Sequence, residues 1–299
     1  MREYAGVYIP VPTPYRGDAV ATERLRGNLE RWNATPLDGY VFLGSTGEFP
    51  MLSDAERDAV LVAAREATPR DKAMIAGTGS HSTLLTIRQT KRAAEIGADA
   101  AIVITPHYFT KGFAQATAQI RHYLAVAEAS PIPILLYNFP VNTGINLEPD
   151  TVARIAEHPN VCGIKDSSGN IPQAAQIIHL TPKSFHVLVG AAAALLPSLA
   201  IGSSGGILAL AVIAPREFCE VYALARQGRW EDAKELAARM VPADRGVPGR
   251  YGIGGLKGRW ICRASSAARA GRPSARRTAM RSTRSRTSSP RRGSSRRTQ

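Results

Sequence analysis

Cysteine is scarce in this chain of 299 residues. Cys162, Cys219 and Cys262 are the only three, and they lie far apart in the sequence. Such spacing fits neither a disulfide framework nor a CxxC metal site, so we expect a reducing compartment, the cytoplasm. The six histidines show no HExxH pattern and no other paired ligand spacing, which predicts that the protein has no metal site.

Long membrane-type segments are also lacking. The amino-terminal residues do not show the charged segment and apolar run of a signal peptide. Val187–Ala214 carries no charge and has the length of a membrane span. Pro197 and the glycine-rich run 202–206 interrupt it, so we expect a buried strand, a helix and another strand, and no membrane partner.

Acidic residues are missing from the last part of the chain. Residues 258–299 contain 13 arginines and no lysine, aspartate or glutamate, whereas residues 1–257 carry 25 basic and 24 acidic side chains. This Arg/Ser/Ala/Pro mixture cannot bury a core, so we predict a disordered tail over residues 258–299. The tail is either a basic arm for nucleic acid or the product of a reading-frame shift. The abrupt change, where a further helix should start, favours the frameshift and disfavours nucleic acid as a partner.

Short apolar segments alternate with helical patterns over residues 1–208. We expect eight strands, at Gly6–Pro10, Gly39–Leu43, Ala73–Gly77, Ala100–Thr105, Ile132–Tyr137, Val161–Lys165, His186–Gly190 and Gly205–Leu208. The alternation predicts an α/β protein, a (β/α)8 TIM barrel whose chemistry lies at the carboxyl ends of the strands. A doubly wound open sheet lacks support because no GxGxxG follows the first strand. Two more helical patterns predict a C-terminal helical extension over residues 209–257.

Lys165 ends the apolar run Val161–Lys165, and polar turn residues follow it at once. A strand-end lysine among apolar neighbours loses hydration, which favours its neutral and nucleophilic amine. Such an amine can form a Schiff base with a ketone. The alternative is a lysine that extends its charged end into water. We expect Asp166 to point away from Lys165, because adjacent strand residues face opposite sides of a sheet.

Two further segments lie at the ends of predicted strands. Gly44–Glu48 reads GSTGE, and its glycines can turn backbone N–H groups and two hydroxyls toward a carboxylate. Tyr137–Pro140 reads YNFP, and its tyrosine can relay protons if the hydroxyl reaches the site. Because all three segments would meet at one mouth of a barrel, we predict a common active site there.

GSTGE, YNFP and GIKDSSG, in this order and spacing, resemble the dihydrodipicolinate synthase and N-acetylneuraminate lyase family of class I aldolases. The resemblance covers about residues 4–257, and within the family the motifs look most like 4-hydroxy-2-oxoglutarate aldolase. It implies a TIM barrel that assembles as a homo-oligomer, a tetramer or a dimer. It also implies a lyase that forms a lysine Schiff base with a 2-oxo acid and needs no metal and no cofactor.

The resemblance further implies roles for single residues. Lys165 matches the Schiff-base lysine, and Tyr137 matches the tyrosine that shuttles protons. Ser45 and Thr46 match the pair that holds the carboxylate of the 2-oxo acid. Tyr108 matches a tyrosine that reaches into the site of a neighbouring subunit and completes a relay of hydroxyls from Tyr137 through Thr46.

Substrate-binding positions follow in the same way. Ser167 resembles a serine that helps to hold the substrate, and Gly190 and Ile207 match positions whose backbone lines the pocket. Asn142 is a departure, because the synthases have an arginine there that grips the carboxylate of aspartate semialdehyde. The expected reaction is therefore cleavage of 4-hydroxy-2-oxoglutarate, or a similar 2-oxo acid, to pyruvate and an aldehyde such as glyoxylate. A 4-hydroxy-tetrahydrodipicolinate synthase and a sugar-acid dehydratase stay open as alternatives.

Overall fold

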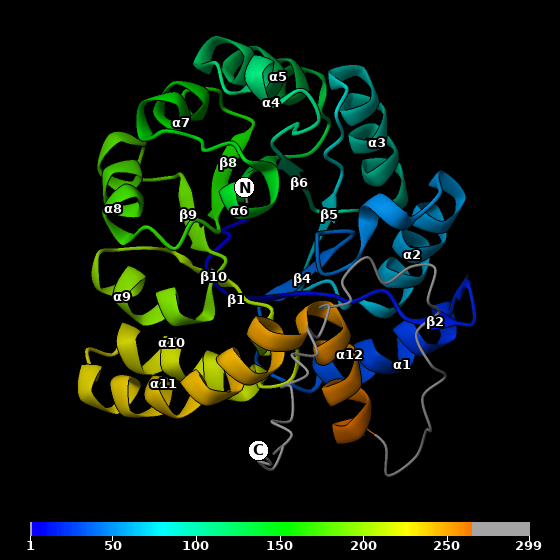
Figure 1. Cartoon of the computed structure of the whole chain (residues 1–299), viewed down its shortest axis with the longest axis vertical. Helices are drawn as coiled ribbons and strands as arrows, with labels where there is room; N and C mark the ends of the chain where they lie inside the picture. The colour runs from blue at the N-terminus through cyan, green and yellow to red at the C-terminus, as the bar shows by residue number, and fades with distance from the viewer. Residues whose placement is uncertain (1, 265–299) are drawn as a thin grey trace, which may run out of the picture.

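Eight parallel strands close into a barrel in the computed structural model, which describes residues 2–264 (Figure 1). The strands are β1 (Gly6–Pro10), β4 (Gly39–Phe42), β5 (Ala73–Gly77), β6 (Ala100–Ile104), β7 (Ile134–Asn138), β8 (Val161–Asp166), β9 (His186–Val189) and β10 (Gly205–Ile207). Each strand pairs with the next along the chain, and β10 pairs with β1 to close the ring. The predicted (β/α)8 barrel is confirmed. A two-stranded hairpin, β2 (Tyr15–Arg16) and β3 (Ala19–Val20), follows β1.

Helices surround the barrel and connect consecutive strands (Figure 1). The longer ones are α1 (Thr22–Asn33), α2 (Asp54–Ala67), α3 (Thr83–Ile96), α5 (Ala116–Ala129), α7 (Pro149–Ala156), α8 (Ile171–Leu180) and α9 (Leu195–Ala200). Short helices α4 (Thr110–Phe113) and α6 (Pro140–Thr143) and the 3₁₀ turns η1 (Phe49–Met51), η2 (Ala192–Ala194) and η3 (Leu210–Val212) lie in the loops. Helix α2 begins at a capping box, in which the Ser53 side chain accepts the backbone N–H of Glu56 and the Glu56 side chain accepts the backbone N–H of Ser53.

The core has an inner and an outer part. Side chains such as Tyr8, Ile75 and Leu188 fill the barrel, while two larger clusters lie between the strands and the helices. The close packing of neighbouring strands depends on small residues. A Cβ atom on Gly163 would lie 2.3 Å from the carbonyl oxygen of His186, so the glycine of GIKD allows β8 and β9 to approach.

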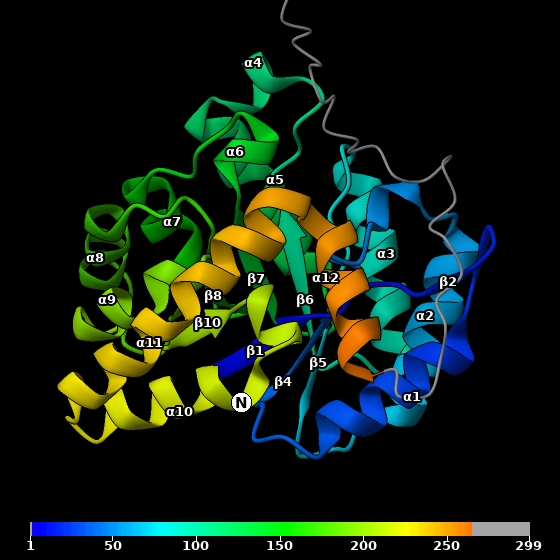
Figure 2. The same cartoon turned by 60° about the horizontal axis from the view of Figure 1, so that its bottom comes forward.

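Three helices follow the barrel: α10 (Pro215–Arg226), α11 (Trp230–Asp244) and α12 (Arg250–Ala264), with a π-helical turn at Arg245–Gly249 between the last two. In both views α12 lies beside α1 (Figures 1 and 2). The Trp260 ring stacks on the Trp32 ring with centroids 4.5 Å apart, and Trp260 Nε1 donates to Asn28 Oδ1 at 2.9 Å.

The boundaries at residues 208 and 257 stay predictions. Helix α12 continues past residue 257 to Ala264. Most of the predicted disordered tail, residues 265–299, lies outside the described residues. Among residues 2–264, no helix combines the length and the apolar character needed to cross a bilayer.

Candidate active site

Lys165 and Tyr137 lie side by side at the carboxyl ends of β8 and β7, where they are register partners. Lys165 is 6% exposed, and its Nζ lies 4.2 Å from the centroid of the Tyr137 ring. The side chain therefore does not extend its amine into water, which decides against the alternative of a solvated lysine. Tyr137 is 4% exposed and belongs to the cluster that fills the barrel. The amine is thus held inside the ring of strands.

The Tyr137 hydroxyl points toward the GSTGE turn. It lies 3.4 Å from Ser45 Oγ, and the Phe139 ring stacks on the Tyr137 ring with centroids 5.7 Å apart. The predicted relay instead joined Tyr137 to Thr46, which is also buried. In the described part of the chain the hydroxyl near Tyr137 is that of Ser45, and the role of Thr46 stays a prediction.

The GSTGE turn leaves backbone donors free for a ligand. Gly47 N donates to Gly44 O and Glu48 N donates to Ser45 O, both at 3.0 Å, so the turn folds back on itself. Within residues 2–264 the N–H groups of Ser45 and Thr46 have no acceptor. Two adjacent free N–H groups beside a serine hydroxyl can bind a carboxylate.

Two residues that the motifs did not reveal shape this turn. Thr13, on the loop after β1, donates from Oγ1 to Gly47 O at 2.6 Å and is buried. Gly77 ends β5, and a Cβ atom there would lie 2.1 Å from Leu43 O, immediately before the turn. No sequence signal marks Thr13, because its partner is 34 residues away; Gly77 could have been recognised as a glycine at a strand end.

Ser167 and Gly190 lie next to Lys165. A Cβ atom on Gly190 would lie 1.8 Å from Ser167 Oγ and 3.0 Å from Lys165 Cε, so only glycine leaves room for both side chains. Gly190 N donates to Asp166 O at 2.7 Å, which fixes the loop after β9 against the end of β8. Ile207 on β10 is fully buried in the inner barrel cluster. These three predicted positions therefore border the buried amine or the barrel interior beneath it.

Asn142 and Tyr108 are placed differently. Asn142 is exposed on α6, a helix that lies above the carboxyl ends of the strands (Figures 1 and 2). Tyr108 is 73% exposed and packs against Phe109 and His81, with ring centroids 5.0 and 5.9 Å away. It does not join the site within one chain, and its role in a neighbouring subunit stays a prediction.

Asp166 faces away from Lys165, as its place on the strand predicts. It is 3% exposed and accepts Asn138 Nδ2 at 2.9 Å, Ser168 N at 3.1 Å and Ser168 Oγ at 2.7 Å. Asn138 is fully buried and accepts Leu147 N at 3.0 Å. This outer network connects β7 and β8 directly behind Tyr137 and Lys165.

The Cys162 thiol lies on the same strand as Lys165. Burial raises the pKa of the Cys162 thiol on β8 to about 12, so the thiol is protonated and a poor nucleophile at neutral pH. Among residues 2–264, no three His, Cys, Asp or Glu side chains are placed to hold a metal ion.

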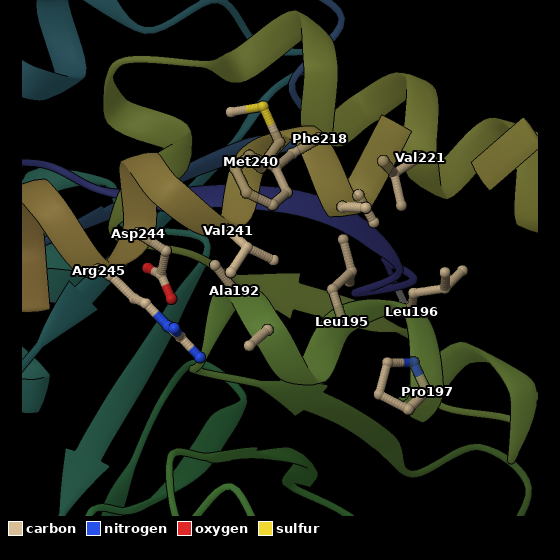
Figure 3. Close-up of a pocket in the computed structure, with 13 residues that line it drawn as sticks. Ala192, Leu195, Leu196, Pro197, Phe218, Val221, Met240, Val241, Asp244 and Arg245 are labelled. Atoms are coloured by element: carbon tan, nitrogen blue, oxygen red, sulfur yellow. The ribbon is translucent and has the colours of Figure 1, made fainter. Parts of the chain in front are cut away.

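A cavity of about 250 Å³ lies elsewhere, between the η2 and α9 segment and helices α10 and α11 (Figure 3). Its walls are mainly apolar side chains such as Leu195, Phe218 and Met240, and Asp244 and Arg245 lie at one end. Burial raises the pKa of Asp244 above its ordinary value. The lining is mainly apolar and lies away from Lys165, so we assign no chemistry to this cavity.

Comparison with known proteins gives a family match over most of the chain. Residues 3–253 match the family described as "Dihydrodipicolinate synthetase family". The protein named 4-hydroxy-tetrahydrodipicolinate synthase of Methanothrix thermoacetophila is 39% identical over 246 residues, which cover 82% of this chain and 82% of that protein. The same name is given to a relative from Methanospirillum hungatei, 36% identical over 82% of this chain and 84% of that protein.

Solved structures with a similar fold support the family match. The chloride-inhibited dihydrodipicolinate synthase of Acinetobacter baumannii, solved with pyruvate, has a TM-score of 0.77 and 33% identity and covers 81% of this chain and 82% of that one. YagE of E. coli K12, also solved with pyruvate, has a TM-score of 0.80 and 28% identity and covers 86% of this chain and 88% of that one.

Proposed function

Because the chain belongs to the dihydrodipicolinate synthetase family, we propose that it is a lysine Schiff-base lyase that acts on pyruvate and an aldehyde. The observation that carries the proposal is the buried Lys165 amine, 4.2 Å from the centroid of the Tyr137 ring. The Tyr137 hydroxyl in turn lies beside Ser45 and its free N–H group. The residues proposed as nucleophile, proton relay and carboxylate site thus lie close together.

The chemistry begins with the carboxylate. The N–H groups of Ser45 and Thr46 bind it, which brings the ketone of the 2-oxo acid to the Lys165 amine. The amine adds to C2, and the Tyr137 hydroxyl helps water to leave, so that an iminium forms. Loss of a proton from C3 then gives an enamine. The enamine carbon attacks the aldehyde carbonyl to form a C–C bond, and the reverse of this step cleaves an aldol product.

The first candidate for the whole reaction is 4-hydroxy-tetrahydrodipicolinate synthesis. Its support is the name carried by the relatives, which are 36 to 39% identical to this chain over about four fifths of its length. In this reaction the aldehyde is aspartate semialdehyde, which carries a carboxylate of its own. The comparisons favour this candidate over the aldolase that the motifs resemble most.

The second candidate is cleavage of 4-hydroxy-2-oxoglutarate to pyruvate and glyoxylate. Asn142 supports it, because a neutral amide on α6 cannot form the bidentate, charge-assisted contact that an arginine makes with a carboxylate. A sugar-acid dehydratase would use the same lysine and the same iminium. All three reactions need Lys165, so the choice between them depends on the residues that contact the rest of the substrate, beyond the 2-oxo acid group.

Borohydride trapping tests the proposal. We expect reduction in the presence of pyruvate to add a pyruvate-derived mass to Lys165, as read by mass spectrometry of the digested protein. The Lys165→Ala variant should gain no mass. A folded wild-type sample without the adduct would reject the Schiff-base mechanism.

Parallel assays separate the candidates. Purified enzyme is supplied either with pyruvate and aspartate semialdehyde, to follow condensation, or with 4-hydroxy-2-oxoglutarate, to follow glyoxylate release. A ratio of kcat/KM values above about tenfold in either direction assigns the function. Dehydration of a sugar acid without aldehyde formation would replace both candidates.

We further propose that the enzyme works in the cytoplasm as a homo-oligomer. The exposed rings of Tyr108 and Phe109, 73% and 69% exposed, give one face of the monomer the aromatic character of an interface. Binding of nucleic acid through the arginine-rich tail is the candidate from another class. It is supported by charge alone, since 13 arginines follow residue 257.

A further inference from the structure

An ion pair joins the carboxylate-binding turn to the last helix of the described chain. Lys257 Nζ on α12 contacts Glu48 Oε2, the last residue of GSTGE, across 209 positions of sequence. The two side chains are 20% and 14% exposed. Lys257 Nζ also lies 4.5 Å from the centroid of the Tyr15 ring on β2. The ammonium group is thus held between a carboxylate and an aromatic face.

Glu48 is well placed to control the turn. Its backbone N–H donates to Ser45 O, so the two residues close the loop that presents the free N–H groups. Glu48 also has φ of +57°, a conformation that L residues rarely adopt and that surrounding contacts must hold. The ion pair with Lys257 and the hydrogen bond from Thr13 to Gly47 O are contacts of this kind.

Contacts between α12 and α1 fix the position of Lys257. One turn after Lys257, the Trp260 ring stacks on Trp32, which is fully buried, and Trp260 also bonds to Asn28 on α1. Leu256, next to Lys257, is 2% exposed. Burial lowers the pKa of Lys257, while the charge of Glu48 opposes that shift. A partly buried pair of this kind is costly to break, because the remaining charge loses its partner.

We propose that Lys257 is a positioning residue for substrate binding: through Glu48 it holds the GSTGE turn in the shape that binds the carboxylate of the 2-oxo acid. Lys257 does not touch the reacting atoms. It therefore acts on the affinity for pyruvate more than on the chemistry at Lys165. The identity of the bound 2-oxo acid rests on the proposed function. The contact between Lys257 and Glu48 does not depend on it.

The test uses Lys257→Met and measures adduct formation at increasing pyruvate concentrations under borohydride. We expect the half-saturating pyruvate concentration to rise at least about tenfold, while the adduct at saturation stays complete. Amide hydrogen exchange over residues 43–49 should accelerate in the same variant, since the turn loses a tether. The matched control is Lys234→Met, which removes a lysine from an exposed pair with Glu231 on α11 and should change neither value.

Lys257→Met with wild-type half-saturation and wild-type exchange would overturn the proposal. If that variant fails to fold, Glu48→Gln provides the same two readouts with an uncharged side chain of equal size, and wild-type values there are equally decisive against it. A wild-type protein that gives no adduct at all would reject the proposed function instead. The exchange measurement would then still decide whether Lys257 holds the turn.

Discussion

At the scale of single residues, Tyr137 is the group whose chemistry is separable from its packing. Its ring lies beneath the Lys165 amine, while its hydroxyl lies 3.4 Å from Ser45 Oγ. Tyr137→Phe keeps the ring and removes the hydroxyl. We expect kcat to fall about 10²- to 10⁴-fold, the usual contribution of a positioned proton-transfer group, with no change in the thermal unfolding midpoint. Turnover at the wild-type rate in this variant would remove Tyr137 from the mechanism.

Asn142 gives a prediction about specificity. Arginine at this exposed position on α6 would supply a charge-assisted contact to an aldehyde that carries a carboxylate. We expect Asn142→Arg to raise kcat/KM for aspartate semialdehyde about tenfold or more, and Asn142→Gln to leave it near the wild-type value. Equal kcat/KM values for all three proteins would show that α6 does not contact the second substrate.

The sequence was sufficient to predict that Lys165, Tyr137 and Ser45 lie near one another, because each stands at or just after the end of a strand and the ends of parallel strands meet. Their catalytic roles stay predictions. The sequence could not predict that Lys257 and Thr13 contact the GSTGE turn. Their partners in the turn are 209 and 34 positions away, and neither residue stands in a recognisable pattern. Contacts between distant segments depend on the packing of whole elements, which local patterns do not specify.

At the scale of elements, β7 and β8 are fastened together behind the site. Asp166 accepts three hydrogen bonds, one from Asn138 on the paired position of β7 and two from Ser168. We expect Asp166→Ala to lower both the unfolding midpoint and kcat, because the buried Asn138 amide loses an acceptor and the strand ends separate. A loss of about 2 to 4 kcal/mol in the free energy of unfolding is expected.

Ser168→Ala is the control, since it keeps the backbone bond to Asp166 and removes the Oγ bond to Asp166 together with the bond that Ser168 Oγ accepts from Asn170 N. The control should retain most of the activity. If Asp166→Ala kept wild-type kcat while the unfolding midpoint fell, the network would serve stability alone. Chemical denaturation and steady-state kinetics on the same samples provide both values.

Helix α5 contains a buried histidine, His122, that makes the stability of the fold depend on pH. His122 is 2% exposed, its Nδ1 lies 2.9 Å from Thr83 Oγ1, and within residues 2–264 its Nε2 has no hydrogen-bond partner. Burial lowers its pKa from 6.5 to about 4. Between these two values the unfolded chain binds a proton that the folded chain does not, so folding becomes less favourable as pH falls.

We expect the His122 contribution to be complete above pH 6.5 and to decrease by about 3 kcal/mol as pH falls to about 4. Chemical unfolding of wild type and His122→Gln across this range measures the difference. The variant should show a smaller loss, and the exposed His179→Gln should follow wild type. Parallel curves for wild type and His122→Gln would contradict the assignment.

The alternation of apolar and helical segments was enough to predict every barrel strand to within two residues at either end. Breaks between helical segments were harder to predict than the strands. Helix α4 ends at Phe113 and α5 begins only at Ala116, and a 3₁₀ turn over Ala192–Ala194 precedes α9. The short helix α6, which positions Asn142, was not predicted, because four residues give no periodicity.

At the scale of the whole molecule, charge and catalysis belong to different parts of the chain. The net charge is +14, and residues 265–299 contribute eleven arginines and no acidic residue. Lys257 and Trp260, which join α12 to the barrel, precede this segment. Truncation after Ala264 therefore removes most of the charge and keeps every contact described for the site.

We expect the truncated protein to form the pyruvate adduct with the wild-type half-saturating concentration, because Lys257 and its partner Glu48 remain. If the arginine-rich tail binds nucleic acid, the full chain should bind duplex DNA with an affinity that falls steeply as salt rises, and the truncated protein should not bind it. A chain cut before Lys257 is the contrasting variant, and it should lose pyruvate affinity because the GSTGE turn loses its tether. Salt-sensitive DNA binding that persists after truncation at Ala264 would mean that the barrel itself, with 25 basic and 24 acidic side chains up to residue 257, carries the basic surface.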